Sequence, residues 1–399
     1  MKNVLMISYG WPPRGAVGML RMVKFAKYLV KSGYNVSVIT KDDSRTGTIS
    51  WDIEEPVLDN VRVYRIAPAS GISLLDRVNT KLQPQFEIEW YRAVEYRLEE
   101  LIKEIDFDVI ISSSPPESAH LIAAAIKKRA NKRWIADLRD LWSRDHYRNL
   151  DFLRRSILFW KERSTLNKAD LILTVSKTWA GFLRKQYGER VVFLPNGYDK
   201  EYFDRIPREV PAKFTISYLG KLNSRHQDIA PFLAAIGKTV KDGRIPKDSL
   251  EVNFYVSGYG KPDIAGFALK HGLSEVVKEF GPVPLSRAFH IMKSSSLLLL
   301  VGWRGMSARG WRPQKLYEYM GSGTPVLLVN GACNEELAEV VAGTKSGNMA
   351  NDITGIEEEI MRRYKDYTDR KISDEFQDKD RLAEYSVSAI TKELCRLIG

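Results

Sequence analysis

The chain has little cysteine and little histidine. Cys333 and Cys395 are its only cysteines, so a disulfide framework is excluded. The histidines, at positions 120, 146, 226, 271 and 290, lie far apart, and no two have the spacing of metal ligands on one helix face. These residues offer no zinc pattern, and a reduced, cytoplasmic compartment is the default. We expect no bound metal and no resident cofactor.

Long hydrophobic runs are also missing. The longest apolar runs, such as 4–7 and 297–301, are far too short to cross a bilayer. The run at 4–7 begins close to residue 1, and no small-residue cleavage site follows it. We therefore expect a strand there and no signal peptide.

The composition that is present is that of a folded, two-domain protein. Hydrophobic residues make up 44% and charged residues 28%, which excludes a largely disordered chain. A length of 399 residues is enough for two domains, each with its own core.

Positive charge is concentrated in the first half. The net charge is +11; residues 1–200 carry 33 Lys and Arg against 24 Asp and Glu, and residues 201–399 carry 28 against 26. Such an excess suits nucleic acid, an anionic membrane surface or phosphorylated small molecules. Because the excess lies in one half, it indicates a partner surface on that half.

Short apolar runs alternate with amphipathic stretches throughout, which predicts parallel sheets with helical crossovers. In the first half we expect strands over 3–8, 35–40, 62–66, 108–112, 133–136, 171–176 and 191–194, and a helix over 19–32. In the second half we expect strands over 214–219, 251–257, 297–301 and 325–329, and helices over 228–241, 262–273, 284–293, 313–321 and 334–342.

These halves define an α/β protein of two doubly wound, Rossmann-like domains, covering 1–200 and 201–379. The turn residues and prolines of 195–213 predict a linker, and a helix over 380–396, in the segment 380–399, is expected to pack back on the first domain. Functional motifs of such halves are expected at a cleft on the carboxyl ends of the strands.

Two segments of the first half carry chemistry. The loop from Ser8 to Gly18 is rich in Gly and Pro and leads into a helix, so its N–H groups suit a phosphate or a sugar oxygen; a plain tight turn is the alternative. Asp137, Arg139 and Asp140 follow a predicted strand directly. We interpret them as site residues, with a surface ion pair and a helix N-cap at Asp140 as the alternative.

Two segments of the second half carry cations. Lys221 and Arg225 follow its first strand, where they could clamp a diphosphate or simply belong to a solvated loop. Residues 309–326 place Arg309, Arg312 and Lys315 around a helix start at Pro313. Glu318, on that helix, is suited to bind paired ribose hydroxyls.

Together these motifs resemble the retaining glycosyltransferases of family 4, which have the GT-B fold. The shared features are the Pro-Pro-x-Gly loop, the Asp-x-x-Asp segment, the Val-Ser and Pro-Asn-Gly-Tyr-Asp of 175–199, the basic loop after Gly220, and Lys-Leu-Tyr-Glu-Tyr-Met-Gly-Ser-Gly-Thr-Pro-Val at 315–326. They occur in the expected order over nearly the whole chain, and the last motif is the most specific.

The resemblance implies transfer of a sugar from a nucleotide-diphospho-sugar, with retention and without a metal. It implies that Glu318 holds the nucleotide ribose, that Lys221 with Arg225 or His226 neutralises the leaving diphosphate, and that Gly15 faces donor phosphate and acceptor. The expected catalytic residues are Arg139, Asp140 and Lys221. The expected donor-binding residues are Gly15, Gly18, Lys221, Arg225, Arg309, Gly310, Lys315, Leu316 and Glu318.

Two positions depart from the family pattern. The glutamate that usually stands eight positions before Glu318 is Gly310 here, and the usual His-Asp pair is Arg139-Asp140. Both changes occur in branches that act on bacterial surface polysaccharides, so the acceptor is expected to be a glycan or a polyprenyl-diphosphate-linked sugar. Three alternatives stay open: a nucleotide-sugar epimerase of GT-B shape, a non-catalytic nucleotide-sugar-binding protein, and a basic nucleic-acid-binding protein. No recognised nucleic-acid-binding motif in the sequence supports the third.

Three further segments have competing interpretations. Asp106 and Asp108 resemble a metal-binding Asp-x-Asp pair but precede their strand, so we interpret Asp108 as a turn residue. The basic, apolar stretch 147–166 suits either an anionic membrane surface on the inner face of the cell membrane or an ordinary helix of the first domain. The stretch 71–98 is either an acceptor-side insertion or a lid.

Overall fold

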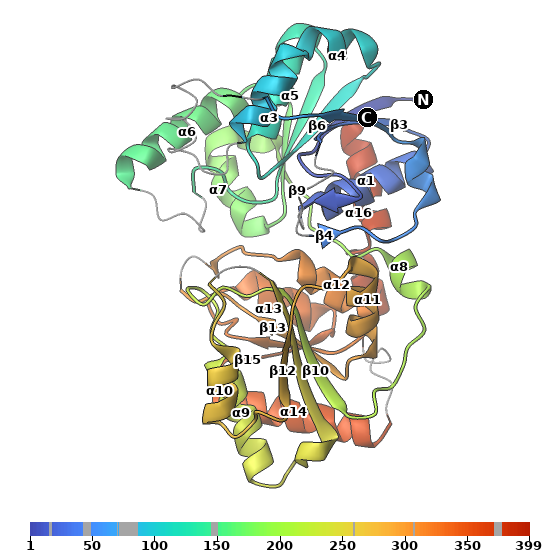
Figure 1. Cartoon of the computed structure of the whole chain (residues 1–399). Coiled ribbons are helices and arrows are strands. Elements are labelled where there is room, and N and C mark those ends of the chain that lie inside the picture. The colour runs from blue at the N-terminus through green and yellow to red at the C-terminus, as the bar shows by residue number, and fades with distance from the viewer. Residues whose placement is uncertain are drawn as a thin grey trace. The chain divides into compact units, whose positions relative to one another are not determined.

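A computed structural model describes residues 1–15, 18–42, 49–69, 71, 87–144, 151–257, 260–305, 308–370 and 377–399 (Figure 1). Its contacts divide the chain into two compact units. The first unit comprises Met1–Pro195 and Ile390–Gly399, and the second comprises Asn196–Ala389.

The first unit is built on a seven-stranded parallel sheet of order β5-β3-β1-β6-β7-β8-β9. Its strands are β1 (Asn3–Ile7), β3 (Asn35–Lys41), β5 (Arg62–Ile66), β6 (Val109–Ser114), β7 (Arg133–Leu138), β8 (Leu171–Thr174) and β9 (Val191–Phe193). Two short strands, β2 (Arg14–Gly15) and β4 (Ile49–Ser50), form a separate antiparallel pair.

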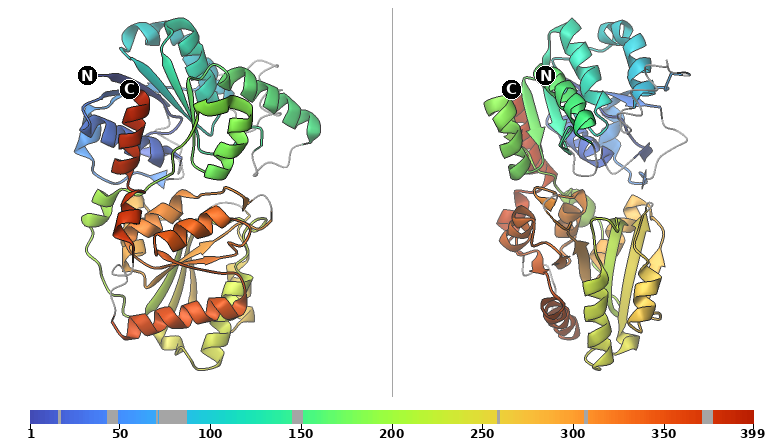
Figure 2. Two further views of the ribbon diagram at one scale, coloured as in Figure 1. Left: turned by 180° about the vertical axis from the view of Figure 1, so that it is seen from behind. Right: turned by 90° about the vertical axis from the view of Figure 1, so that its left-hand side faces the viewer.

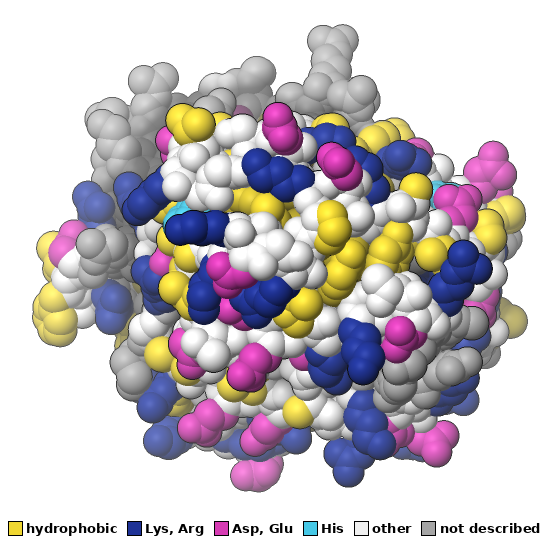
Figure 3. Space-filling view, turned by 90° about the horizontal axis from the view of Figure 1, so that it is seen from below, with side chains coloured by type: hydrophobic (Ala, Val, Ile, Leu, Met, Phe, Trp, Pro, Cys, Tyr) yellow, Lys and Arg dark blue, Asp and Glu magenta, His cyan; other side chains and the backbone are white. Residues whose placement is uncertain are grey.

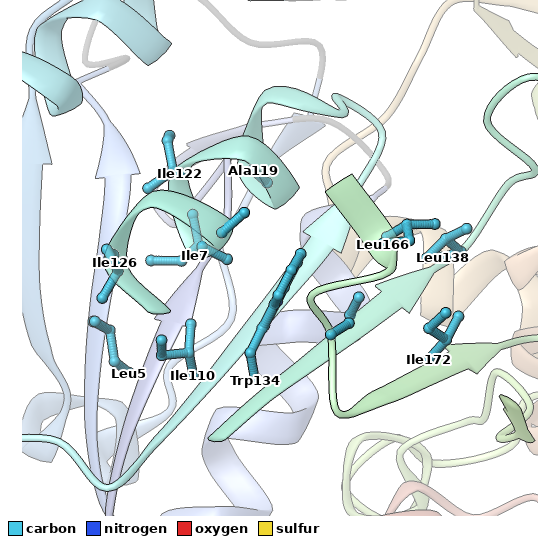
Figure 4. Close-up of a cluster of buried hydrophobic side chains, with 14 of the residues drawn as sticks. Leu5, Ile7, Ile110, Ala119, Ile122, Ile126, Trp134, Leu138, Leu166 and Ile172 are labelled. Atoms are coloured by element: carbon cyan, nitrogen blue, oxygen red, sulfur yellow. The ribbon is translucent and has the colours of Figure 1, made fainter. Parts of the chain in front are cut away.

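Helices cover both faces of this sheet (Figure 2). They are α1 (Met19–Lys31), α3 (Ile88–Tyr96), α4 (Leu98–Glu104), α5 (Ser118–Ala130), α6 (Phe152–Leu166), α7 (Lys177–Tyr187) and the end of α16 (Val387–Ile398), with short 3-10 turns at Pro56–Asn60 and Gly188–Arg190. The buried core beneath α5 gathers Leu5, Ile110, Ile126 and the fully buried indole of Trp134 (Figure 4). Burial of such apolar faces is the main force that holds helices onto the sheet.

The second unit repeats the design with a six-stranded parallel sheet of order β12-β11-β10-β13-β14-β15. Its strands are β10 (Phe214–Lys221), β11 (Leu250–Ser257), β12 (Val277–Phe280), β13 (Leu297–Val301), β14 (Val326–Val329) and β15 (Gly347–Ala350). Its helices are α8 (Lys200–Asp204), α9 (Ala230–Lys241), α10 (Ile264–Lys270), α11 (Leu285–Ser294), α12 (Gln314–Ser322), α13 (Glu335–Gly343), α14 (Ile353–Thr368), α15 (Lys379–Ala383) and the start of α16, with a 3-10 turn at Lys247–Ser249.

The predicted fold class, two doubly wound parallel-sheet domains, is confirmed. The sequence missed the two edge strands of the second sheet, β12 and β15, whose sequences VKEF and GNMA contain no apolar run. An edge strand pairs on one side only and can stay exposed, so it does not need the apolar pattern of an inner strand.

The single helix expected over 380–396 is instead two helices, α15 and α16. The chain between them pairs with the backbone of Tyr198, which donates to the carbonyl of Tyr385 and accepts from the N–H of Val387. These bonds replace helical ones and end α15. Of the stretch 71–98, residues 88–96 form α3, a core helix with Trp90 buried, while Leu74, Leu75, Leu82 and Phe86 lie outside the described residues.

In each sheet the chain reverses its direction of winding at one place. This switch point lies between β1 and β6 in the first sheet and between β10 and β13 in the second. Open α/β sheets bind ligands at the carboxyl ends of the strands that flank such a point. The loops after β1, β6, β10 and β13 are therefore where each unit is expected to bind its ligand.

Among the described residues, no helix combines the length and the apolar character needed to cross a membrane. The end of the second unit that carries α9 and α14 exposes cations and anions side by side, with apolar side chains between them (Figure 3). That mixed surface agrees with the small net charge of residues 201–399.

Candidate functional site

The carboxyl end of β10 is joined to the start of α12 by one lysine. The ammonium Nζ of Lys315 donates to the hydroxyl oxygen of Tyr218 at 2.7 Å and to the backbone carbonyl of Lys221 at 3.2 Å. It also lies 4.2 Å from the centre of the Tyr218 ring, within the range of a cation–π contact. The Tyr218 hydroxyl donates to the same carbonyl of Lys221 at 2.6 Å, which completes a triangle of hydrogen bonds.

Burial lowers the pKa of Lys315 to about 7. The physical cause is desolvation: a charged ammonium loses its hydration when it is buried, and this loss disfavours the charged form. Burial also raises the pKa of Tyr218, which keeps its hydroxyl neutral and able to donate. Lys315 is therefore poised to become fully charged when an anion binds beside it.

Two more features hold α12 against this strand. Tyr319, one turn after Lys315, accepts a hydrogen bond from the N–H of Leu219 at 2.9 Å. Gly220 has a positive φ of 105°, and a Cβ atom there would lie 3.3 Å from Nζ of Lys315. Only glycine meets both demands without strain, so the close approach of Lys315 to the strand depends on it.

The N-terminus of α12 has the character of an anion site. The helix begins after Pro313, an N-cap residue that makes no side-chain capping bond, and its first turn holds no acidic residue. Unfilled N–H groups and the positive end of the helix dipole favour a negatively charged group. Lys315, in the first turn of the same helix, adds a cation.

Glu318 lies on the next turn of α12 and is buried. Its Oε1 accepts a hydrogen bond from the side-chain amide of Gln314 at 2.7 Å, and that amide also donates to the carbonyl of Gly197 at 2.9 Å. Gln314 therefore fixes the rotamer of the carboxylate from one side.

The other predicted residues of this unit are distributed over the loops after β10 and β13. Lys221 and Arg225 are exposed, and the Asn223 side chain accepts from the N–H of Arg225 at 3.0 Å, which shapes the turn. Arg309 is exposed, Gly310 has a positive φ of 76°, and Leu316 is fully buried.

Sequence reasoning missed a stack of three rings at the same end of the sheet. The ring centroids of His226 and Trp303 lie 4.4 Å apart with planes 7° apart, and those of Trp303 and Trp311 lie 5.3 Å apart. The backbone N–H of Arg304 donates to the carbonyl of His226, which ties the two loops together. The signal in the sequence was a pair of tryptophans flanking Gly310 at a strand end.

Arg312, which the sequence placed among the cations of this helix start, has a structural role. Its guanidinium donates to Oε1 of Glu336 at 2.8 Å, and both side chains are buried. The guanidinium also lies over the rings of Tyr317 and Tyr385. This ion pair fixes the loop before α12 to α13.

In the first unit, Arg139 lies against the start of α1. Its Nε and Nη2 donate to the carbonyl oxygens of Ser114 and Pro115 at 3.0 and 2.6 Å, which hold it over the carboxyl end of β6. A Cβ atom on Gly18, the N-cap of α1, would lie 1.8 Å from Nη1 of Arg139. The N-cap residue Gly18 makes no side-chain capping bond and the first turn of α1 holds no acidic residue, so a guanidinium and a positive helix end lie together.

A buried polar network lies beneath Arg139. Asp137 is fully buried and accepts from the guanidinium of Arg21 at 3.0 Å and from the hydroxyl of Ser113 at 2.8 Å. Arg21 also donates to the carbonyls of Leu194 and Pro195. This bidentate ion pair between β7 and α1 is structural, so Asp137 supports the site from below.

His120 completes that network and was not singled out by sequence reasoning. Its ring nitrogens lie 2.8 Å from the hydroxyl of Ser112 and 2.9 Å from that of Ser114. Burial lowers the pKa of His120 to about 3, with the Asp137 carboxylate opposing the shift. The imidazole is neutral throughout the physiological range and serves to hold the β6 end.

The remaining predicted residues of the first unit lie near these loops. Asp140 is partly exposed after β7, and residues 141–144 are not helical, so no helix begins at Asp140. Gly15 belongs to β2, where it pairs with Ile49 of β4. Ala16 and Val17 of the same loop lie outside the described residues.

No group of three or more His, Cys, Asp or Glu side chains in the described part of the chain is placed to hold a metal ion. Asp106 and Asp108 both bind Asn3 at the start of β1: Asp108 accepts from the N–H of Asn3 at 2.9 Å, and Asp106 accepts from the side-chain amide of Asn3 at 2.6 Å. The Asp-x-Asp pair is therefore occupied at the amino end of β6, as a turn at the strand start requires.

Residues 21–202 match the family model of Glycosyltransferase Family 4. This is the family that the motifs resemble, and the resemblance is confirmed over this stretch. No curated protein matches the chain.

Solved structures share the fold over the whole chain. Sucrose-phosphate synthase from Thermosynechococcus elongatus superposes with a TM-score of 0.70 at 16% identity, covering 100% of this chain and 98% of that one. HepE of Anabaena, in complex with UDP-glucose, gives a TM-score of 0.66 at 13% identity, with coverages of 100% and 99%. WaaG, a glycosyltransferase involved in lipopolysaccharide biosynthesis, gives 0.62 at 16% identity, with 99% of each chain covered. The fold is therefore that of GT-B glycosyltransferases.

Proposed function

We propose that the chain transfers a sugar from a nucleotide-diphospho-sugar to a glycan or a lipid-linked acceptor, with retention of configuration, in the synthesis of a cell-surface polysaccharide. The observation that carries the proposal is the contact between Lys315 and the carbonyl of Lys221, which brings two lysines to an uncapped helix N-terminus at the switch point of the second sheet. Such an arrangement suits the two phosphates of a donor.

In this proposal the second unit binds the donor. The first N–H groups of α12 and the ammonium of Lys315 would receive the diphosphate. Lys221 and Arg225, both exposed beside them, would neutralise the charge that develops as the sugar leaves. Cations in these positions supply the stabilisation for which other transferases use a metal ion, so the proposed reaction is metal-independent.

Glu318 would hold the ribose of the nucleotide. A carboxylate accepts from two adjacent hydroxyls with charge-assisted hydrogen bonds, and Gln314 presents it in a fixed orientation. The solved structures of HepE contain UDP or UDP-glucose, which supports a uridine donor as the first candidate.

The first unit would bind the acceptor side of the reaction. Arg139 is held by two carbonyl oxygens over the start of α1. An anionic group there would be attracted by both the guanidinium and the positive end of the helix dipole. The net positive charge of residues 1–200 favours an acceptor that carries phosphate or carboxylate. Asp140 would act beside Arg139 on the reacting sugar.

The experiment is a thermal-shift screen of UDP-, GDP- and ADP-sugars with the full chain, followed by detection of released nucleoside diphosphate when acceptors are added. Stabilisation by one donor and release that depends on an acceptor support the proposal. Failure of every donor to stabilise the protein contradicts it.

One observation favours a second candidate. Gly310 stands where the family usually has a glutamate, so a non-catalytic nucleotide-sugar-binding protein would have the same donor site without transfer. Donor binding without release of nucleoside diphosphate, in the presence of acceptors, would select that candidate; an isomerised sugar would select an epimerase.

A further inference from the structure

Helix α6 exposes an apolar stripe. Phe152, Leu153 and Trp160 are 86%, 69% and 71% exposed, and Ile157 is 37% exposed. At 3.6 residues per turn these four side chains lie within an arc of about 140° on the helix surface. Scattered exposed apolar residues are ordinary, but several large ones on one helix face mark an interaction surface.

The opposite face of α6 is the one that packs on the protein. Leu158, Thr165 and Leu166 are buried there, together with Glu162, which accepts from the N–H of Ser143 at 2.8 Å and from the Tyr187 hydroxyl at 3.0 Å. The helix is thus anchored by one face and presents the apolar stripe on the other. In two views its N-terminal part extends away from the body of the first unit (Figures 1 and 2).

Arginines accompany the stripe. Arg154, Arg155 and Arg163 are exposed on α6. Lys161 contributes less, since it is partly buried and burial lowers its pKa. An apolar stripe flanked by cations fits the boundary between headgroups and acyl chains of an anionic bilayer, with arginines on lipid phosphates and tryptophan at the interface.

A second copy of the chain fits this surface less well. A symmetric contact through the stripe of α6 would bring the arginines of both copies toward each other, because a two-fold interface uses the same patch twice. The charge of the patch therefore argues for an anionic occupant.

We propose that α6 docks the first unit onto an anionic membrane surface, with Phe152, Leu153, Ile157 and Trp160 inserted at the level of the lipid headgroups. This inference goes beyond the proposed transfer reaction and does not depend on it. It concerns attachment to one side of a bilayer by a surface helix.

The test is sedimentation of the full chain with vesicles of phosphatidylcholine alone and of phosphatidylcholine mixed with phosphatidylglycerol. We expect binding to the anionic vesicles only, weakening as salt is raised. The combined variant Phe152→Ser, Leu153→Ser, Trp160→Ser should bind these vesicles at least about tenfold more weakly than the parent, since it removes most of the inserted area. Replacing Arg154, Arg155 and Arg163 by Glu should weaken binding roughly 100-fold.

Two controls separate this surface from general stickiness. Tyr96→Ser on α3 and Leu269→Ser on α10 remove exposed apolar side chains elsewhere and should leave vesicle binding unchanged. All changes lie on the surface, so the unfolding temperatures should match that of the parent protein. Equal binding to both kinds of vesicle, or equal binding by the apolar variant and the parent, overturns the proposal. So does a parent dimer that becomes a monomer in the apolar variant without vesicle binding by either, which would assign the stripe to self-association.

Discussion

The guanidinium of Arg139 fills the space beside Gly18 so closely that a Cβ atom on residue 18 would lie 1.8 Å from Nη1. Gly18 has ordinary helical backbone angles, φ −60° and ψ −23°, which any residue can adopt. Glycine is therefore needed here to leave room for the guanidinium and not to allow an unusual backbone conformation. The two residues are separated by more than a hundred positions in the sequence, yet the position of one depends on the other.

Gly18→Ala should therefore displace Arg139 while leaving the fold intact. If Arg139 acts on the reacting sugar, a displacement of about 1 Å or more should lower kcat/KM by roughly 100-fold. Thermal unfolding and steady-state transfer would be measured together.

The matched control is Gly181→Ala, in the exposed middle of α7, where a Cβ atom would meet nothing within 4 Å. It should raise the stability by about 0.5–1 kcal/mol and leave activity unchanged. An active Gly18→Ala enzyme would remove Arg139 from the proposed machinery.

Lys221→Ala should lower kcat by roughly 100-fold, because a cation at the leaving diphosphate acts in the transition state. Donor affinity should fall much less. Lys213→Ala, at an exposed residue just before the amino end of β10, is the control and should behave like the parent. Equal turnover of both variants would rule out the role of Lys221.

Glu318→Gln should weaken UDP binding about 10–100-fold, since hydrogen bonds to an ionised acceptor contribute about 1.5–3 kcal/mol. Calorimetric titration with UDP and with 2′-deoxy-UDP distinguishes the cause. The parent should prefer UDP, and the variant should lose most of that preference. Glu335→Gln, exposed on α13, should change neither.

Donor binding should be coupled to proton uptake through Lys315. Its pKa is lowered to about 7 by burial, and a diphosphate beside it should raise that pKa again. At pH 8 the Lys315 side chain is therefore mostly neutral in the free protein and charged in the complex with the donor. Titration of UDP in buffers of different ionisation enthalpy should show uptake of a proton that Lys315→Met abolishes.

The same group links stability to pH. In the unfolded chain Lys315 keeps its ordinary pKa of about 10.4, so between pH 7 and that value the unfolded state binds more protons than the folded one. Stability then rises with pH across this window, by the linkage relation. Lys315→Met should flatten the rise, and an unchanged slope of unfolding free energy against pH would contradict the lowered pKa.

Glu336→Ala should destabilise the second unit by about 3–5 kcal/mol, because it leaves the buried guanidinium of Arg312 without its carboxylate. The double change Arg312→Met, Glu336→Leu should recover most of that loss. Chemical denaturation measures both. A small effect of Glu336→Ala would mean that Tyr317 and Tyr385 hold Arg312 by themselves.

The sequence predicted the inner strands well, because runs such as Leu297–Val301 are apolar on both faces and can lie only inside a parallel sheet. It could not predict β12, whose Lys278 and Glu279 belong to an edge. Local rules predicted the start of α12 to within one residue: Pro313 is its N-cap, and Gln314 is its first helical residue.

The contacts of the site did not follow from such rules. Lys315 reaches Tyr218 across 97 positions of sequence, and Arg312 turns away from the helix start to Glu336. Pairings of this kind are decided by how helices pack on the sheet, which a single sequence does not encode locally. For the same reason His120, a lone histidine in an apolar stretch, gave no sign of its serine partners.

The stack of His226, Trp303 and Trp311 gives the second unit an optical reporter of its own. An imidazole held flat against an indole quenches its fluorescence, most strongly when protonated. A nucleotide that shifts the loop after β10 or the loop after β13 would separate the rings and change the emission, with no dye attached.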